Sequence, residues 1–325
     1  MTAPVVAVIG AGPCGLAAAV ALEQAGMPAI VFDKGCVASS IVGYPPYLVF
    51  FSTADRISVG GLPFIVATEK PTRRDALDYY RLVVTRFGLT VRQYEPVTAV
   101  ARESRGFVVE SVPMGGTPRE TRVRAVVVAT GYFGSPNALG VPGEELPHVT
   151  HDFLEGHVAF QRSALVVGGG NSAVETALDL CRAGARVTLV HFGPTFDKNI
   201  KPWVLPEFER RVRDGEIGVR WNSRVTGITA SSAHLSGPAG EAEQEAQHVF
   251  VMTGYTPHPG LLASLGVVTD SVTGVPAHDP VTMETPTRGV FIAGVLASGY
   301  NANKIFIENG RDHGELIARA LAERR

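Results

Sequence analysis

The chain has 325 residues, carries a net charge of −2 and has a sequence pI near 6.5. This length suffices for two domains with cores of their own, and the charge balance leaves no basic excess that would favour nucleic acid or an anionic membrane as a partner. The sequence contains neither a membrane-spanning apolar run nor a charged segment ahead of its first apolar stretch, so we expect a cytoplasmic protein with no nucleic-acid and no membrane partner.

The first predicted element is an apolar strand that runs into a glycine-rich turn, VVAVIGAGPCG at 5–15. In this G-x-G-x-x-G pattern Gly10 allows the tight turn, Gly12 lets a dinucleotide pyrophosphate approach the backbone, and Gly15 lets the next helix pack on its strand. The free amides at the start of that helix would face the pyrophosphate. Asp33 ends the following strand, AIVFD, where a carboxylate can bond a ribose hydroxyl. Strand, helix, strand and acid together predict a dinucleotide site.

The three cysteines, Cys14, Cys36 and Cys181, form neither a C-x-x-C motif nor a metal-ligand spacing, so no metal site is expected. Cys14 lies inside the glycine turn, where the helix amides favour a thiolate and a bound pyrophosphate opposes it. A redox thiol and a small residue that merely fills the turn are the two interpretations of Cys14. The direction of its pKa shift is left open by the sequence.

The segment 35–70 is rich in glycine, proline and aromatic residues and has no regular period, which is typical of a cover over a ligand. Its aromatic run, YPPYLVFF at 44–51, would line a flavin ring or form a separate hydrophobic cluster. A helix is predicted next, with Thr72 as its cap, Asp75 three residues later and Gly88 at its end. Short alternating strands follow, up to VVVATG at 126–131.

A second copy of the strand–turn–helix–strand unit occupies 164–192, with three consecutive glycines at 168–170. His191 follows Gly168 by 23 residues, the separation of the acid from the first glycine in the first copy. Because a carboxylate would repel a 2′-phosphate and an imidazole would not, this unit is predicted to bind NADPH. Lys198 and Lys201 would complete the anion site, or belong to a solvated loop.

The turn after 126–131 is mirrored by VFVMTG at 249–254, and the pair brackets an insert. The predicted fold is therefore α/β, with two Rossmann-like dinucleotide-binding domains of the three-layer ββα type. The first domain is expected to be discontinuous, at 1–133 and 252–325, and the second, NADPH-binding domain is expected at 134–251. After the insert, TRGVFIAGV at 287–295 predicts a strand that ends at Gly294, before a helix whose first amides would face the flavin.

Several distinctive stretches together resemble the YpdA-type bacillithiol-disulfide reductases, a group of thioredoxin-reductase-like flavoproteins. They are GAGPCG, YPPYLVFFST, VVVATGYFGSPN, GGGNSAVE, KPWVLPEFE, VFVMTGY and IAGV followed by NANKIFIENG. The resemblance implies FAD in the first domain, NADPH in the insert, and reduction of bacillithiol disulfide. Family members carry a cysteine at the position of Cys14, which implies a redox role. Val295 stands where related flavoproteins have an acid, as in the YpdA type, whereas His191-Phe192 replaces a Tyr-Arg pair that members can show.

Together these patterns define the expected site. Cys14 is the candidate catalytic residue, and its thiolate is expected to attack one sulfur of the substrate disulfide. The FAD-binding residues are predicted to be Gly10, Gly12, Pro13, Cys14, Gly15, Asp33, Lys34, Val97, Thr130, Gly131, Gly294, Val295, Ala302 and Asn303. The NADPH-binding residues are predicted to be Gly168, Gly170, Asn171, Ser172, Ala173, Glu175, His191, Lys198, Lys201 and Gly254.

The sequence is also compatible with three functions other than that of a disulfide reductase. A flavin monooxygenase and a ferredoxin-type NADP reductase both combine two dinucleotide units without a redox-active dithiol. A non-enzymatic redox sensor is the third. A homo-oligomer, a dimer or higher, is expected in the case of the reductase.

Overall fold

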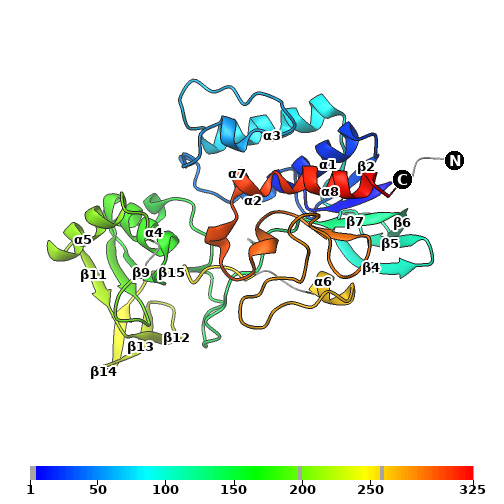
Figure 1. Cartoon of the computed structure of the whole chain (residues 1–325). Helices are drawn as coiled ribbons and strands as arrows, with labels where there is room; N and C mark the ends of the chain where they lie inside the picture. The colour runs from blue at the N-terminus through cyan, green and yellow to red at the C-terminus, as the bar shows by residue number, and fades with distance from the viewer. Residues whose placement is uncertain (1–4, 133, 197–199, 257–259, 325) are drawn as a thin grey trace. The chain divides into compact units, whose positions relative to one another are not determined.

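The computed structural model describes residues 5–132, 134–196, 200–256 and 260–324. The chain forms two compact units (Figure 1), of which the first comprises Met1–Val42, Tyr47–Ser135 and Thr256–Arg325. The second comprises Gly43–Pro46 and Pro136–Tyr255. It starts and ends slightly later than the insert expected at 134–251, because Pro136 pairs with Tyr255 and the amide of Asn137 donates to the carbonyl of Gly254 at 2.9 Å.

The first unit is built on a parallel five-stranded sheet with the order β16-β7-β1-β2-β3. Neighbouring strands run in register, so that Val6 of β1 lies beside Ala29 of β2 on one side and Ala125 of β7 on the other. The central strands are almost entirely apolar and buried, as expected when both faces of a parallel sheet are covered. The strands are β1 (Val6–Ile9), β2 (Ala29–Phe32), β3 (Thr90–Arg92), β7 (Ala125–Val128) and β16 (Val290–Ile292).

Helices and a second sheet cover this parallel sheet. Helix α1 contacts β1, β2 and β7 and packs against α3 and α8. On the other side lies an antiparallel sheet, β4-β5-β6, whose β5 contacts β7 (Figure 1). These elements are α1 (Pro13–Gln24), α3 (Arg73–Phe87), α8 (His313–Ala322), β4 (Val97–Glu103), β5 (Gly106–Ser111) and β6 (Arg119–Val123).

Helix α3 shows how the local sequence sets an element's ends. The Thr72 side chain accepts a bond from the amide of Asp75, and the Asp75 side chain accepts one from the amide of Thr72, which is a complete capping box. Gly88 ends the helix in the left-handed conformation, with φ of 62°. The helix predicted from this pattern is confirmed.

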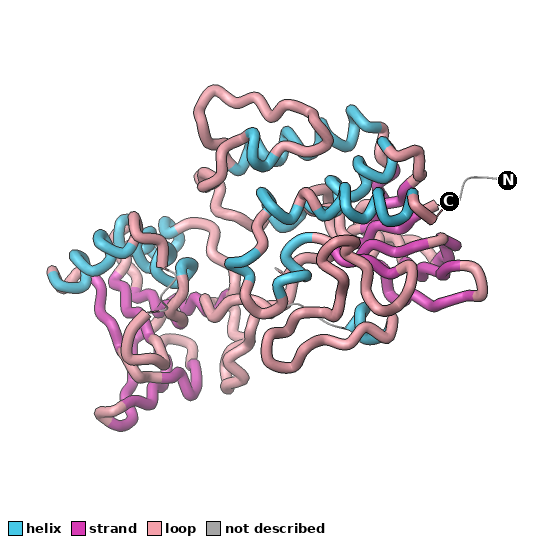
Figure 2. The backbone as a smooth tube through the Cα atoms, in the orientation of Figure 1, coloured by secondary structure: helices cyan, strands magenta, loops and turns pink. Residues whose placement is uncertain are grey.

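The remaining elements of the first unit are short and lie in the connections, which are extensive in this unit (Figure 2). They are α2 (Ser39–Val42), α6 (Gly260–Ser264), α7 (Ile307–Gly310) and the 3₁₀ turns η1 (Asp55–Ile57), η3 (Gly294–Ser298) and η4 (Ala302–Lys304).

The second unit repeats the plan on a smaller scale, with a parallel sheet of order β11-β10-β9-β15-β8 and an antiparallel sheet β12-β13-β14. Alternate residues of β9 enter different cores: Val166 packs with α4 and α5, and Leu165 packs with β12 and β13. This alternation places the parallel sheet between helices and the second sheet. The elements are β8 (Val149–Thr150), η2 (Gly156–Ala159), β9 (Ser163–Val167), α4 (Asn171–Arg182), β10 (Arg186–Val190), α5 (Leu205–Arg213), β11 (Ile217–Arg220), β12 (Arg224–Ile228), β13 (Ser232–Gly237), β14 (Gly240–Glu245) and β15 (His248–Val251).

Among the helices that the structure describes, none combines the length and the apolar composition needed to cross a bilayer.

Candidate functional site

The first glycine turn follows β1 and is shaped by close backbone approaches. Gly10 has a φ of +114°, and a Cβ there would lie 2.3 Å from the carbonyl oxygen of Ala129. A Cβ on Gly15 would lie 1.9 Å from the carbonyl oxygen of Gly10. At Gly12, by contrast, a Cβ would meet no described atom within 4 Å. Gly10 and Gly15 therefore serve the packing of the turn, and Gly12 faces open space.

Helix α1 begins at Pro13 directly behind this open position. Gly12 is its N-cap, and no side chain of the described residues caps it. Proline at the first helical position has no amide to satisfy, and the following amides point along the helix axis toward the turn. These donors and the helix macrodipole suit an anion such as a pyrophosphate.

Asp33 connects the end of β2 to the glycine turn. Its Oδ2 accepts a hydrogen bond from the amide of Ala11 at 2.6 Å, and its Oδ1 accepts one from the amide of Gly35 at 2.7 Å and one from the hydroxyl of Ser39 at 3.3 Å. The carboxylate thus holds the turn in place. Because each carboxylate oxygen has two lone pairs, Asp33 keeps acceptor capacity for a ribose hydroxyl.

The other predicted FAD residues lie on several connections of the first unit. Thr130 and Gly131 follow β7, while Gly294 and Val295 open the η3 turn after β16. These positions share the carboxyl edge of the parallel sheet with the glycine turn, where ligands bind in open α/β sheets. The remaining predicted residues are Lys34 after β2, Val97 at the start of β4, and Ala302 and Asn303 in η4.

Cys14 lies at the start of α1, between two glycines from the C-terminal part of the chain. A Cβ on Gly294 or on Gly310 would lie 3.0 Å from the Cys14 sulfur. Burial, with a smaller contribution from the charge of Asp312, raises the pKa of the Cys14 thiol to about 12. The sequence left the direction of this pKa shift open. In the structure the pKa of Cys14 is raised, because desolvation outweighs the stabilisation of a thiolate by the helix start.

His313 is a residue of this region that the sequence analysis missed. Its Nδ1 accepts a hydrogen bond from the amide of Gly294 at 3.1 Å, which places the imidazole proton on Nε2. Burial, and after it the charge of His278, lowers the pKa of His313, while Asp312 opposes the shift. The imidazole is accordingly neutral near pH 7. The sequence could have indicated His313 only by its position at the start of the last predicted helix, since no motif contains this residue.

The second glycine turn repeats the arrangement. Gly168 has a φ of +147°, and a Cβ there would lie 2.3 Å from the carbonyl oxygen of Met252. Gly170 is the N-cap of α4, again without a capping side chain in the described part of the chain. Ser172 and Ala173 belong to the first turn of this helix, and Gly254 follows β15. The start of α4 thus offers free amides to an anion as α1 does.

Lys201 is engaged inside the second unit. Its Nζ forms an ion pair with Glu175 Oε1 at 2.8 Å, and its amide donates to Asn171 Oδ1 at 2.8 Å. These contacts tie three of the predicted NADPH residues together at the start of α4. Lys198, the other predicted lysine, lies outside the described residues.

His191 directly follows β10 and is only 4% exposed. A Cβ on Gly169 would lie 2.2 Å from its ring, so glycine is needed there for the imidazole to fit. Its Nδ1 is buried and has no hydrogen-bond partner among the described residues. The next residue, Phe192, is 62% exposed, and the guanidinium carbon of Arg224 lies 4.9 Å from its ring centroid. Arg224 is a cation at this strand end that the sequence analysis missed.

Residues 7–294 match the family described as pyridine nucleotide-disulphide oxidoreductase. The chain belongs to this family, and the predicted α/β fold with two Rossmann-like units is confirmed. Membership implies FAD and NADPH as the cofactors of an oxidoreductase. The starts of α1 and α4, which no described side chain caps, fit the pyrophosphates of two dinucleotides.

Within the family the chain is similar to Bacilliredoxin reductase Bdr of Bacillus subtilis, with 45% identity over 98% of this chain and 97% of that protein. The structure of Bacillithiol Disulfide Reductase Bdr (YpdA) from Bacillus cereus superposes with a TM-score of 0.97 at 42% identity and full coverage of both chains. The corresponding structure from Staphylococcus aureus has a TM-score of 0.93 at 38% identity, again with both chains fully covered.

Proposed function

We propose that this chain is an NADPH-dependent FAD flavoprotein that reduces the disulfide of a low-molecular-weight thiol, bacillithiol disulfide. The observation that carries the proposal is a lone cysteine, Cys14, in the first glycine turn of a chain similar over its full length to proteins named for this activity. The absence of a C-x-x-C motif in the sequence distinguishes the chain from a dithiol reductase.

We assign FAD to the first unit, in two segments of the chain, and NADPH to the second. The amides at the start of α1, Asp33 and the η3 turn would hold FAD. The amides at the start of α4, together with His191 and the basic side chains nearby, would hold NADPH. When bound, the two cofactors supply the electron pair that reduces a disulfide. The chain's own residues bind and orient the reactants.

Cys14 is assigned the redox role within this proposal. Its sulfur would bond to one sulfur of the substrate as the substrate's S–S bond breaks, and the first thiol leaves with the proton that Cys14 loses. An electron pair supplied by the bound cofactors, with two protons from the cofactor hydride and solvent, would then split the mixed disulfide, restoring the Cys14 thiol and releasing the second thiol. With a pKa of about 12, roughly one Cys14 in 10⁵ is ionised at pH 7. Deprotonation must therefore accompany substrate binding.

His313 is assigned a positioning role. Its Nδ1 is occupied by the amide of Gly294, the residue that also packs on the Cys14 sulfur. A neutral imidazole fixed in this tautomer leaves Nε2–H as a donor. We assign it the function of holding the η3 turn in the form that Cys14 and FAD require.

The cellular setting belongs to the same proposal. Cys14, Cys36 and Cys181 are all free cysteines, which suits a reducing cytoplasm. We propose a homo-oligomer, a dimer or higher, by analogy with the family. A second candidate substrate is a protein: the Bacillus subtilis relative is named a bacilliredoxin reductase, so a protein that carries the disulfide would take the place of the small molecule.

The experiment that tests the proposal is NADPH oxidation by the FAD-loaded protein and by a Cys14→Ala variant. Bacillithiol disulfide, glutathione disulfide, cystine and dioxygen are compared as oxidants. We expect fast oxidation with bacillithiol disulfide and its loss in the variant. Oxygen consumption with product hydroxylation would instead indicate a monooxygenase, and ferredoxin reduction that is indifferent to Cys14→Ala would indicate a ferredoxin reductase.

A further inference from the structure

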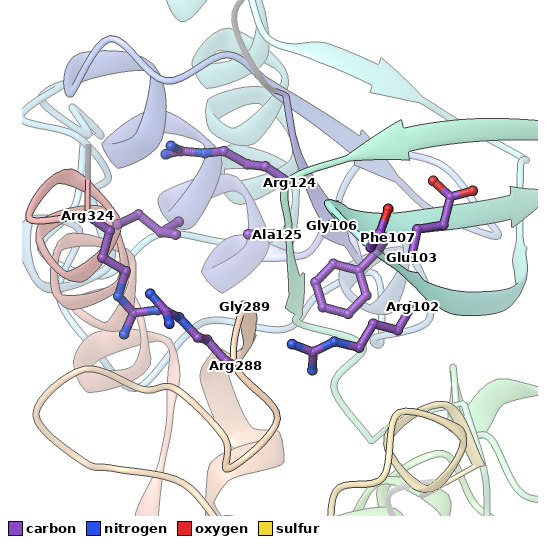
Figure 3. Close-up of a pocket in the computed structure, with 11 residues that line it drawn as sticks. Arg102, Glu103, Gly106, Phe107, Arg124, Ala125, Arg288, Gly289 and Arg324 are labelled. Atoms are coloured by element: carbon purple, nitrogen blue, oxygen red, sulfur yellow. The ribbon is translucent and has the colours of Figure 1, made fainter.

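A hollow of about 260 Å³ lies in the first unit, between the antiparallel sheet and the end of the last helix (Figure 3). Its lining includes the apolar residues Phe107, Ala125 and Leu321. Its lining also includes four arginines and one acidic residue: Arg102, Arg124, Arg288, Arg324 and Glu103. The lining thus has a clear excess of positive charge in a chain whose net charge is −2.

The hollow is separate from the proposed cofactor site. Ala125 is the first residue of β7, and Gly289 immediately precedes β16. Both mark the amino ends of these strands, whereas Thr130 and Gly294 follow their carboxyl ends. The two sites lie at opposite ends of the same sheet, roughly the length of a four-residue strand apart.

The arginines come from different segments and enter one region. In the view of Figure 3 the guanidinium group of Arg288 points away from Phe107, toward that of Arg324, and the guanidinium group of Arg102 lies on the other side of the hollow, below Phe107. The side chain of Arg124 points away from the others. Three segments, those of Arg102, Arg288 and Arg324, therefore have to fold together before this charge cluster exists.

The neutralisation of these cations is incomplete. Arg324 forms a two-bond ion pair with Glu284, whose other contact is the amide of Gly289 at 2.8 Å. Glu103 is paired with Arg122 at 3.4 Å. In the described part of the chain neither Arg102 nor Arg288 forms an ion pair: Arg102 lies over the ring of Phe107 at 5.8 Å, and Arg288 acts on Glu284 only through its charge.

The guanidinium groups of the cluster indicate which kind of ligand would bind in the hollow. A guanidinium presents a planar fork of donors that matches a carboxylate or a phosphate with two parallel hydrogen bonds. The volume of the hollow is about nine times the volume that one water occupies in the liquid, so the hollow has room for a molecule with more than one acidic group. We propose that this hollow is a binding site for a small polyanion carrying two or more phosphate or carboxylate groups, distinct from the cofactor sites.

The proposal is tested by titration calorimetry on the full-length FAD-loaded protein. Pyrophosphate is the phosphate probe and citrate the carboxylate probe. We compare the wild type with an Arg102→Ala/Arg288→Ala double variant, in which the two cations without ion pairs are removed. We expect saturable binding of at least one probe by the wild type and about tenfold or greater weakening in the double variant, as for the loss of a charge-assisted contact.

The matched control is an Arg105→Ala/Arg319→Ala double variant, which removes the same charge from exposed positions that do not line the hollow. Retained affinity in the control supports the proposal. It is overturned if neither probe binds, or if the two double variants lose affinity equally, since the effect is then general charge attraction or binding at a cofactor turn. Circular dichroism checks that both variants fold.

Discussion

The amide of Gly294 donates a hydrogen bond to Nδ1 of His313 at 3.1 Å, joining the end of β16 to the start of α8. Because Gly294 also packs on the sulfur of Cys14, one glycine connects the candidate redox thiol, the η3 turn and the last helix. The bond requires an unprotonated Nδ1, so the contact depends on a neutral imidazole.

This dependence predicts a loss of stability in acid. Burial lowers the pKa of His313 below its ordinary value of 6.5, so the unfolded chain binds more protons than the folded chain as the pH falls through about 6.5. The contribution is complete above about pH 7.5 and is lost on acidification. We expect His313→Gln, which keeps an acceptor but does not titrate, to flatten the decline in thermal midpoint between pH 8 and pH 5.

The control for this measurement is His234→Gln, an exposed histidine on β13. His248, whose pKa is also lowered by burial, contributes a slope of its own that both variants retain. An unchanged pH dependence in His313→Gln would show that the imidazole is not held neutral by this contact.

Gly12 and Gly15, which lie on either side of Cys14 in the first glycine turn, should respond differently to replacement by alanine. In Gly15→Ala the new Cβ would lie 1.9 Å from the carbonyl of Gly10, so we expect a fold destabilised by about 2 kcal/mol or more. In Gly12→Ala the Cβ meets open space, so we expect a folded protein with reduced FAD content, because the Cβ occupies the approach of the pyrophosphate. Urea unfolding and the flavin-to-protein absorbance ratio separate these outcomes. Full FAD occupancy in Gly12→Ala would show that the pyrophosphate of FAD does not bind at this turn.

The raised pKa of Cys14 predicts that its thiol is alkylated slowly. At pH 8 we expect iodoacetamide to label Cys14 about a thousandfold more slowly than a free cysteine, with the rate rising about tenfold per pH unit, because the thiolate is the reacting species. Mass spectrometry of the tryptic peptides measures this rate separately for Cys14, Cys36 and Cys181. Rapid labelling of Cys14 at pH 7 would contradict the packing of its sulfur against Gly294 and Gly310.

We expect Arg224 to contact the 2′-phosphate of NADPH. Lys201 already pairs with Glu175, whereas Arg224 lies on the exposed ring of Phe192 beside the end of β10. We expect Arg224→Ala to weaken binding of 2′,5′-ADP about tenfold or more and to leave 5′-AMP unaffected, with Arg224→Lys intermediate. Arg213→Ala, on the exposed side of α5, is the control. Equal loss for the two nucleotides would place the phosphate elsewhere.

The sequence predicted those features that are local in the chain. The strands, the turns at Gly10 and Gly168 and the capped helix after Thr72 follow from short patterns whose physical requirements are met by neighbouring residues. The contacts that the sequence missed join residues far apart: His313 with Gly294, and Arg224 with Phe192. No motif encodes such pairs, because tertiary packing alone brings them together.

Burial was the second limit of the sequence analysis. The helix start at Cys14 favours a thiolate, but the opposing desolvation depends on Gly294 and Gly310, which approach the sulfur only in the folded unit. In the same way, the ion pair of Lys201 with Glu175 is a contact between two predicted NADPH residues that the sequence did not indicate.

The central claim is that electrons from NADPH reach a small disulfide through this chain. It is tested most directly by following NADPH oxidation and thiol release together, with the FAD-loaded protein and bacillithiol disulfide. The account predicts two thiols released for each NADPH consumed, with no consumption when the disulfide is omitted. NADPH oxidation that proceeds equally without the disulfide, or that releases no thiol, would contradict it.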